Sequence, residues 1–298
     1  MAFAVQHPGK LPEVALVLRG KQGTGKGVFA RWFGELFGQH FLHLSQARHV
    51  AGNFNAHLQD AVLVFADEAF LAGDHQAEGS LKMLVTEPEL VIEQKGKDVT
   101  RAKNLIHLIV ASNHDWVIPA AAEERRFCVL DVSDARAQDH EYFGALVRQM
   151  EEGGLEAMLY DLLHEDLSGF NVRKAPVTAA LQDQKFRSMD SFAKWWFGRL
   201  SDGQVRDDDS GWVEAVPRDE LVQDVKAATG REWSSQEVRN KLARLLPAGF
   251  PEDGPRRRRE DGSGRLRTWV LPNLAECRRE FERRTKAKYP WPADEEEQ

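Results

Sequence analysis

A glycine-rich segment near the N-terminus has the composition and spacing of a phosphate-binding loop. It follows a short apolar run, residues 14–18, and precedes an amphipathic stretch, residues 28–37. Glycines let the backbone turn tightly enough to direct N–H groups at phosphate oxygens, at the positive end of the following helix. We expect a lysine in the loop to reach the β- and γ-phosphates of a nucleotide. The candidate residues are Gly20, Gln22, Gly23, Thr24, Gly25, Lys26 and Gly27.

The loop departs from the usual motif at one position. Gly27 stands where a Ser or Thr hydroxyl normally coordinates Mg²⁺, so one metal ligand is missing. Thr24 and a water molecule are the alternatives for that position. ATP and Mg²⁺ are the expected cofactors, and the sequence predicts nucleotide binding more directly than it predicts the rate of hydrolysis.

Polar residues also follow the next two apolar runs. Residues 61–65 lead into Asp67 and Glu68, and residues 105–110 lead into Asn113. A carboxylate at Asp67 can hold Mg²⁺, and one at Glu68 can orient and deprotonate the attacking water. The Asn113 amide can hydrogen-bond the γ-phosphate or that water. Together with Lys26, these residues predict a site for phosphoryl transfer.

Two arginines, Arg125 and Arg126, precede a fourth apolar run at residues 127–130. A guanidinium supplied by a neighbouring subunit can stabilise charge in the transition state as an arginine finger. That role would require a ring of subunits. Which of the two arginines performs it is left open by the sequence.

The elements that must position these residues follow from the apolar pattern. The four runs are continuous rather than alternating, which is typical of strands buried on both faces. Helical stretches at residues 28–37, 81–85 and 142–163 separate or follow them. We therefore predict a mostly parallel, three-layer α/β domain that carries the phosphate loop, over residues 1–200.

The sequence after residue 200 predicts a linker and a second, smaller domain. Residues 201–211, rich in Asp and Gly, are the expected linker, and residues 293–298 form an acidic tail. Helices are expected at 217–229 and 234–246, followed by a basic hairpin with its tip at 262–264. This order predicts a winged-helix-like module over residues 212–292, with the second helix in the DNA major groove and the wing on the backbone. Its candidate DNA contacts are Arg239, Lys241, Arg244, Arg256, Arg257, Arg258, Arg259, Arg265 and Arg267.

Charge and composition narrow the function classes. The net charge of -7 hides a segment, residues 212–292, with 18 Lys and Arg against 13 Asp and Glu. The chain has 298 residues, 42% of them hydrophobic, which is enough for two cores but without an apolar run that could span a bilayer. It shows no secretory signal, and two cysteines cannot form a disulfide framework. A cytoplasmic protein without a membrane role is expected.

The motifs together resemble the superfamily 3 helicase domain of phage and plasmid primase-helicases, particularly the phage primase-polymerase group with a GxxGxGKG loop. The segments that carry the resemblance are GKQGTGKG, FADEA, LKMLVTEPELVIEQKGKDV, IVASN and ERRFCVLDV, between residues 8 and 200. It implies an AAA+-like core that assembles as a homo-hexamer around single-stranded DNA and translocates using ATP. It also implies a pore hairpin, with Lys95 and Lys97 as its DNA contacts. Gly27 is usual for that group.

The resemblance favours an ATP-dependent DNA helicase that acts on forked duplexes in phage or mobile-element replication, in the host cytoplasm if phage-encoded. Such helicases carry a helical collar, and often a primase or polymerase domain, before the first strand. Few residues precede Val14, so we expect the chain to be a fragment or a shortened open reading frame, with an upstream primase or polymerase domain or partner. Two alternatives stay open: an ATPase that loads, packages or remodels DNA complexes without unwinding, and a DNA-binding protein switched by nucleotide.

Overall fold

The computed structural model describes residues 1–46, 49, 52, 54–68, 75–207, 209–258 and 265–292. They form two compact units. The first unit is Met1–Ala120 with Glu124–Arg187, and the second is Ala121–Glu123 with Ser188–Gln298. The boundary therefore lies before residue 188, whereas the sequence had indicated a boundary at residue 200. The predicted linker, 201–211, lies inside the second unit, where its Val205 is fully buried.

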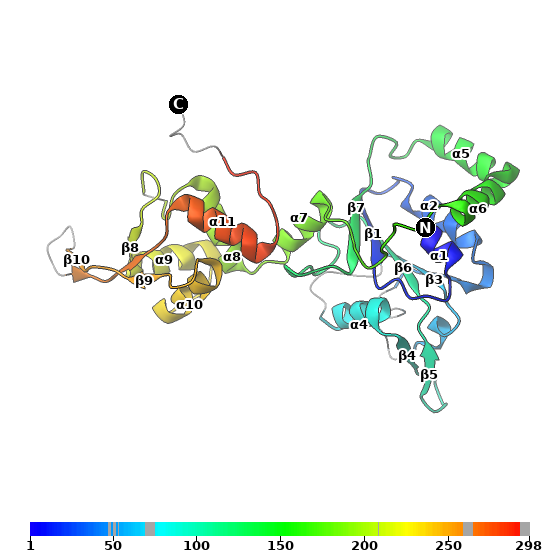
Figure 1. The fold of residues 1–298 in the computed structure, drawn as a ribbon, viewed down its shortest axis with the longest axis horizontal. Coiled ribbons are helices and arrows are strands. Elements are labelled where there is room, and N and C mark those ends of the chain that lie inside the picture. The colour runs from blue at the N-terminus through cyan, green and yellow to red at the C-terminus, as the bar shows by residue number, and fades with distance from the viewer. Residues whose placement is uncertain are drawn as a thin grey trace. The chain divides into compact units, whose positions relative to one another are not determined.

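A five-stranded sheet forms the centre of the first unit (Figure 1). Every neighbouring pair of its strands is parallel, as predicted. The four predicted strands are present with ends shifted by one or two residues, and a fifth strand, β2, was not predicted. In their order across the sheet, the strands are β2 (Phe41–Leu44), β3 (Leu63–Asp67), β6 (His107–Ser112), β1 (Ala15–Arg19) and β7 (Phe127–Asp131).

Apolar side chains on both faces of this sheet are buried. In β3, Val64 belongs to one core cluster and Phe65 to another, as expected for side chains that alternate across a strand. The first cluster includes Leu81 of helix α4 and Leu181 of helix α7, and the second includes Phe33 of helix α2. Helices thus cover both faces, which is compatible with the predicted three-layer α/β fold. These helices are α2 (Lys26–Glu35), α4 (His75–Thr86) and α7 (Ala179–Arg187).

The predicted helix at 142–163 is interrupted. Gly153 has a φ of 101°, which breaks the helical path, so the segment forms two helices joined by a short π-helical turn. A hairpin also projects from the unit, with Gly96 in its turn at a φ of 76°. The remaining elements of the unit are α1 (Ala2–Gln6), η1 (Gly38–His40), η2 (Ala56–Leu58), the hairpin strands β4 (Glu89–Ile92) and β5 (Thr100–Lys103), α5 (His140–Gln149), η3 (Met150–Gly154) and α6 (Leu155–His164).

The second unit combines helices with a small antiparallel sheet, β8-β12-β9, and a separate strand pair, β10-β11. The second predicted helix begins as expected, because Ser234 and Glu237 form a capping box. Arg259, the hairpin tip at 262–264 and the tail at 293–298 lie outside the described residues. The elements are α8 (Ser191–Asp202), β8 (Ala215–Pro217), α9 (Arg218–Thr229), α10 (Ser235–Leu245), β9 (Glu252–Asp253), β10 (Arg257–Arg258), β11 (Arg265–Leu266), β12 (Thr268–Val270) and α11 (Leu274–Thr285).

Helix α8 explains why the boundary differs from the prediction. Its side chains Phe192, Trp196 and Leu200 are fully buried in one cluster with Trp269 of β12 and Phe281 of α11. The sequence pattern of α8 indicates an amphipathic helix but does not tell which core receives its apolar face. Among the described residues, no helix has the length and apolar character needed to cross a membrane.

We expect Trp196→Ala to destabilise the second unit by about 3–5 kcal/mol, because it removes a large, fully buried side chain from that core. Tyr160→Ala, at a position 61% exposed in the first unit, is the control and should change stability by less than about 0.5 kcal/mol. Calorimetry of the full chain measures both. Loss of stability confined to the first unit would contradict the observed boundary.

Candidate functional site

The predicted phosphate loop connects the end of β1 at Arg19 to the start of α2 at Lys26. Gly23 and Gly25 have φ values of 78° and 92°, in the left-handed region that favours glycine. A Cβ added to Gly25 would also collide with the ring of Phe143. Gly27, one residue into α2, has nothing within 4 Å of an added Cβ.

The Lys26 side chain points back over the loop. Its residue is 7% exposed, and its Nζ donates to the carbonyl oxygens of Gly20 at 2.7 Å and Lys21 at 2.9 Å. A third hydrogen bond, of 2.8 Å, goes to Oδ1 of Asn113 beyond the end of β6. Burial lowers the pKa of Lys26 below its ordinary value, while Glu68 and Asp67 nearby oppose that shift. The ammonium thus links the loop to the neighbouring strand.

The acidic pair lies at the same edge of the sheet. Asp67 is the last residue of β3, and Glu68 follows it with a φ of 53°. Backbone strain of this kind is concentrated at functional sites. Oε1 of Glu68 accepts a 2.8 Å hydrogen bond from the backbone N–H of Asn113. The structure therefore brings Lys26, Glu68 and Asn113 into one connected group, with Asp67 beside it.

Two histidines that sequence reasoning missed face the carboxylates. Nε2 of His43, on β2, lies 3.6 Å from Oδ2 of Asp67, and Nε2 of His114 lies 3.9 Å from Oε2 of Glu68. No sequence signal indicated His43, because β2 was not predicted. His114 directly follows Asn113, so its place next to the motif could have indicated it. In the described part of the chain, no group of three or more His, Cys, Asp or Glu side chains forms a metal cage. A Mg²⁺ ion here would rely on one carboxylate with waters and phosphate oxygens, as is usual.

A cavity of about 710 Å³ adjoins the loop. Gly25 and Lys26 border it, and its other walls are mostly apolar. Nε1 of Trp32 is buried without a hydrogen-bond partner, so one donor of the wall is unsatisfied. Apolar walls with few polar groups are typical of sites for planar ligands. The principal aromatic and aliphatic lining residues are Phe29, Trp32, Leu130, Val132, Tyr142 and Phe143.

The two candidate finger arginines lie away from this group. Arg125 and Arg126 precede β7, whereas the loop and the acidic pair follow the carboxyl ends of parallel strands. They therefore occupy the opposite edge of the sheet. Their backbone N–H groups donate to the buried Glu124 carboxylate at 3.1 and 2.9 Å. Either guanidinium can serve a phosphate site only in another subunit.

The other predicted cations are divided between free and paired side chains. On α10, Arg239 pairs with Asp253 at 2.9 Å, and Lys241 pairs with Asp190. The side chain of Arg258 is outside the description, as is Arg259. Seven other candidates are exposed and form no ion pair with any described residue. They are Lys95, Lys97, Arg244, Arg256, Arg257, Arg265 and Arg267.

We expect Gly25→Ala to weaken nucleotide binding at least about fivefold, because an alanine is strained at this φ and its Cβ meets Phe143. Gly27→Ala makes the same chemical change in open space and should alter affinity less than about twofold. Titration calorimetry with Mg-ADP measures both variants. Equal affinities would show that the loop does not bind the phosphates.

Comparison with known proteins adds a phage relative. Residues 18–126 match a family of unknown function, DUF5906. A DNA primase-polymerase from Nitratiruptor phage NrS-1 is 26% identical over 139 residues, which are 45% of this chain and 19% of that protein. The matched part therefore spans about a fifth of the length of this curated relative.

Two solved structures have the same fold. The apo structure of the NrS-1 C-terminal region aligns with a TM-score of 0.70 and 17% sequence identity, over 91% of this chain and 70% of that chain. Its A form apo structure gives a TM-score of 0.68 and 18% identity, with the same coverage. The chain is thus similar in sequence to a phage primase-polymerase and in fold to the C-terminal region of NrS-1.

Proposed function

We propose that this chain is the ATP-driven DNA motor of a phage replication protein, a helicase of superfamily 3 type. The similarity to a phage primase-polymerase supports a role in phage DNA replication. The observation that supports an ATP-driven motor is the connected group of Lys26, Asn113 and Glu68 at the carboxyl edge of three adjacent strands. The site of a phosphoryl transfer to water needs a cation, a base and a polar sensor in this proximity.

The residues have distinct roles in this proposal. The loop N–H groups and Lys26 bind the phosphates, and Lys26 exchanges the carbonyl oxygens of Gly20 and Lys21 for phosphate oxygens. Asp67, an oxygen ligand at the strand end, would hold Mg²⁺, which neutralises phosphate charge when bound. Oε1 of Glu68 is held by the Asn113 N–H. Its Oε2 is then the atom that accepts the proton from the attacking water.

The cavity beside the loop supports binding of the rest of the nucleotide. Its walls begin at Gly25 and Lys26 and continue over Phe29, Trp32 and Phe143. A base placed there would bury its faces against aromatic rings. We assign the nucleoside to this cavity.

The order of elements in the second unit supports the proposal that it is a winged-helix module that binds DNA. Its elements run α8, β8, α9, α10, β9 and β12, with the β10-β11 strands between the last two. In such modules the second helix of the helix-turn-helix enters the major groove. We propose this role for α10, with the exposed Arg244 as a contact, and a phosphate-binding role for the arginines of the strand pair. Arg239 and Lys241 would first have to leave their acidic partners.

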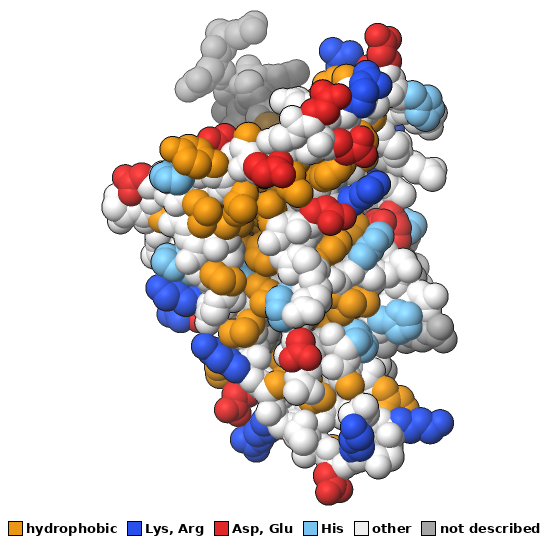
Figure 2. All heavy atoms as spheres, turned by 90° about the vertical axis from the view of Figure 1, so that its right-hand side faces the viewer, with side chains coloured by type: hydrophobic (Ala, Val, Ile, Leu, Met, Phe, Trp, Pro, Cys, Tyr) orange, Lys and Arg blue, Asp and Glu red, His pale blue; other side chains and the backbone are white. Residues whose placement is uncertain are grey.

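Assembly as a ring is part of the proposal. Figure 2 shows hydrophobic side chains gathered on a face of the first unit, and the exposed residues of this unit include Tyr142, Tyr160 and Leu163. Neither α5 nor α6 has a fully buried residue, and although Leu162 packs on the core, the exposed Tyr160 and Leu163 of α6 are available to another subunit. A homo-hexamer would bring Arg125 or Arg126 to a neighbour's phosphates. It would also place Lys95 and Lys97 of the β4-β5 hairpin along single-stranded DNA.

One observation favours a second candidate function. Gly27 supplies no hydroxyl to a metal ion, which weakens the machinery for hydrolysis but leaves the phosphate loop intact. A DNA-binding protein that nucleotide switches without turnover would also have this site. Normal DNA affinity without ATP turnover in a folded preparation would select that function over the motor.

We expect Glu68→Gln to retain nucleotide binding while lowering ATP turnover about 10²–10⁴-fold, because it removes the general base. Lys26→Ala should lose both binding and turnover. Glu35→Gln, at an exposed position on α2, is the matched control and should hydrolyse ATP at the wild-type rate. Phosphate release and titration calorimetry measure the two properties. Turnover by Glu68→Gln at the wild-type rate would remove Glu68 from its assigned role.

The DNA interface is tested by salt dependence. Replacing Arg244, Arg265 and Arg267 with Ser should reduce the magnitude of the slope of log affinity against log salt by about one unit per arginine. Each phosphate contact that is lost reduces the number of counterions that binding releases. Arg231→Ser is the control, because that side chain already pairs with Glu237 and covers Trp233. Fluorescence anisotropy with duplex DNA gives the slopes. An unchanged slope in the triple variant would place the DNA elsewhere.

A further inference from the structure

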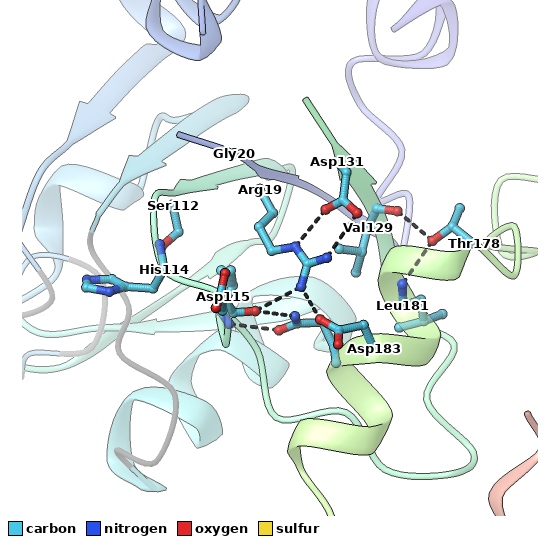
Figure 3. Close-up of polar contacts among 12 residues, drawn as sticks. Arg19, Gly20, Ser112, His114, Asp115, Val129, Asp131, Thr178, Leu181 and Asp183 are labelled. Atoms are coloured by element: carbon cyan, nitrogen blue, oxygen red, sulfur yellow. Dashed lines mark hydrogen bonds and ion pairs between the residues drawn. The ribbon is translucent and has the colours of Figure 1, made fainter. Parts of the chain in front are cut away.

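Arg19, the last residue of β1, is the centre of a polar network directly before the phosphate loop (Figure 3). Its Nε and Nη2 donate to the two carboxylate oxygens of Asp131, at the end of β7, at 2.6 and 2.9 Å. Its Nη1 donates to the backbone oxygen of Asp115 at 3.0 Å and to the carboxylate of Asp183 on α7. One guanidinium thus joins two strand ends, the segment after β6 and a helix.

The segment after β6 is fastened to the same helix by two further side chains. Nε2 of Gln184 donates to the Asp115 oxygen at 2.6 Å, and Oε1 of Gln184 accepts from the backbone N–H of Val117 at 2.8 Å. Nη2 of Arg187 lies 3.4 Å from Oδ2 of Asp115. This segment begins with Asn113, whose side chain accepts the Lys26 hydrogen bond. Lys26 is therefore connected to α7 through a few consecutive residues.

Helix α7 is also held at its other end, and the chain that follows it belongs to the second unit. Oγ1 of Thr178 donates to the backbone oxygen of Val129 at 2.6 Å and accepts from the N–H of Leu181 at 3.1 Å. The helix ends at Arg187, the last residue of the first unit. Asp190 then begins α8 as its N-cap and pairs with Lys241 of α10. A short connection thus leads from α7 to the N-cap of α8, which pairs with a side chain of the proposed DNA-reading helix.

The network differs from a typical surface ion pair in its geometry and in the burial of its arginine. The Arg19 side chain is only 15% exposed, and its contact with Asp131 is bidentate. Burial raises the pKa of Asp183, but hydrogen bonds from Arg19 and Arg187 outweigh it and hold that pKa below its ordinary value. Removing one of the two carboxylates leaves Arg19 with a single ionic partner. The network therefore constrains where α7 and the Asn113 segment lie.

We propose that Arg19 is a positioning residue that couples the phosphate loop to α7 through Asp183 and the Asn113 segment, so that nucleotide binding changes the stability of α7. The inference rests on the proposed nucleotide site. Phosphates that occupy Lys26 compete with its hydrogen bond to Asn113, and the segment 113–118 carries that change to the helix it is bonded to. Because a ligand shifts an equilibrium only through differential contacts, the exchanged Lys26 bond is the required difference.

Two isosteric substitutions separate this role from a general loss of structure. Asp183→Asn removes the ion pair of Arg19 with α7, together with that of Arg187, and leaves the contact with Asp131. Asp131→Asn removes the ion pair with β7 and leaves the contact with α7. Each variant replaces one of the two carboxylates that pair with the Arg19 guanidinium by an amide. Hydrogen exchange of α7 amides, residues 179–187, is compared in the full chain with and without Mg-ATPγS. Calorimetry and exchange at the loop, residues 20–27, report nucleotide binding in the same samples.

In the wild type, Mg-ATPγS should change exchange at both the loop and α7. Asp183→Asn should keep the change at the loop, lose at least about half of the change at α7, and lower ATP turnover at least about threefold with KM within about twofold. Asp131→Asn should retain the change at α7. A loop response without an α7 response in the wild type, or equal effects of the two variants on α7, overturns the inference alone. Absence of binding in the wild type overturns the proposed function and this inference with it.

Discussion

The buried ammonium of Lys26 is the interaction on which the proposed site depends. A charged group with 7% exposure is stable only when hydrogen bonds replace its water, and the loop carbonyls and Asn113 provide them. These hydrogen bonds tie the loop to the residue that follows β6, the strand that pairs with β1. Asn113 accepts the Lys26 bond with its side chain, and its backbone N–H orients Glu68. One cation therefore organises residues from three strands.

The parts of the site that local pattern determines were predictable. Glycine spacing, the strand before the loop and the carboxylates after an apolar run indicated Lys26, Asp67, Glu68 and Asn113, and the structure brings them to one edge of a parallel sheet. Their chemical roles remain predictions. Contacts between distant segments gave no sequence signal. Arg19 looks like an ordinary strand end until Asp131 and Asp183, more than a hundred residues later, are seen beside it.

The domain boundary differs from the predicted one for a related physical reason. A polar, glycine-containing stretch at 201–211 has the composition of a linker, but its Val205 and the preceding α8 belong to the second core. Periodicity shows that a helix has an apolar face and does not show what covers it. With α8 included, the second unit has the helix that a winged-helix module needs before its first strand. Charge on α10 is likewise modified by context, since acidic partners occupy Arg239 and Lys241.

The central claim, that Lys26 exchanges carbonyl oxygens for phosphate oxygens, is tested most directly by a crystal structure with Mg²⁺ and a non-hydrolysable ATP analogue. We expect the β- and γ-phosphates within hydrogen-bond distance of Lys26 Nζ and of the loop N–H groups, the metal beside Asp67, and the base in the cavity lined by Trp32. Lys26 still bonded to Gly20 and Lys21 with the nucleotide bound elsewhere would contradict the account.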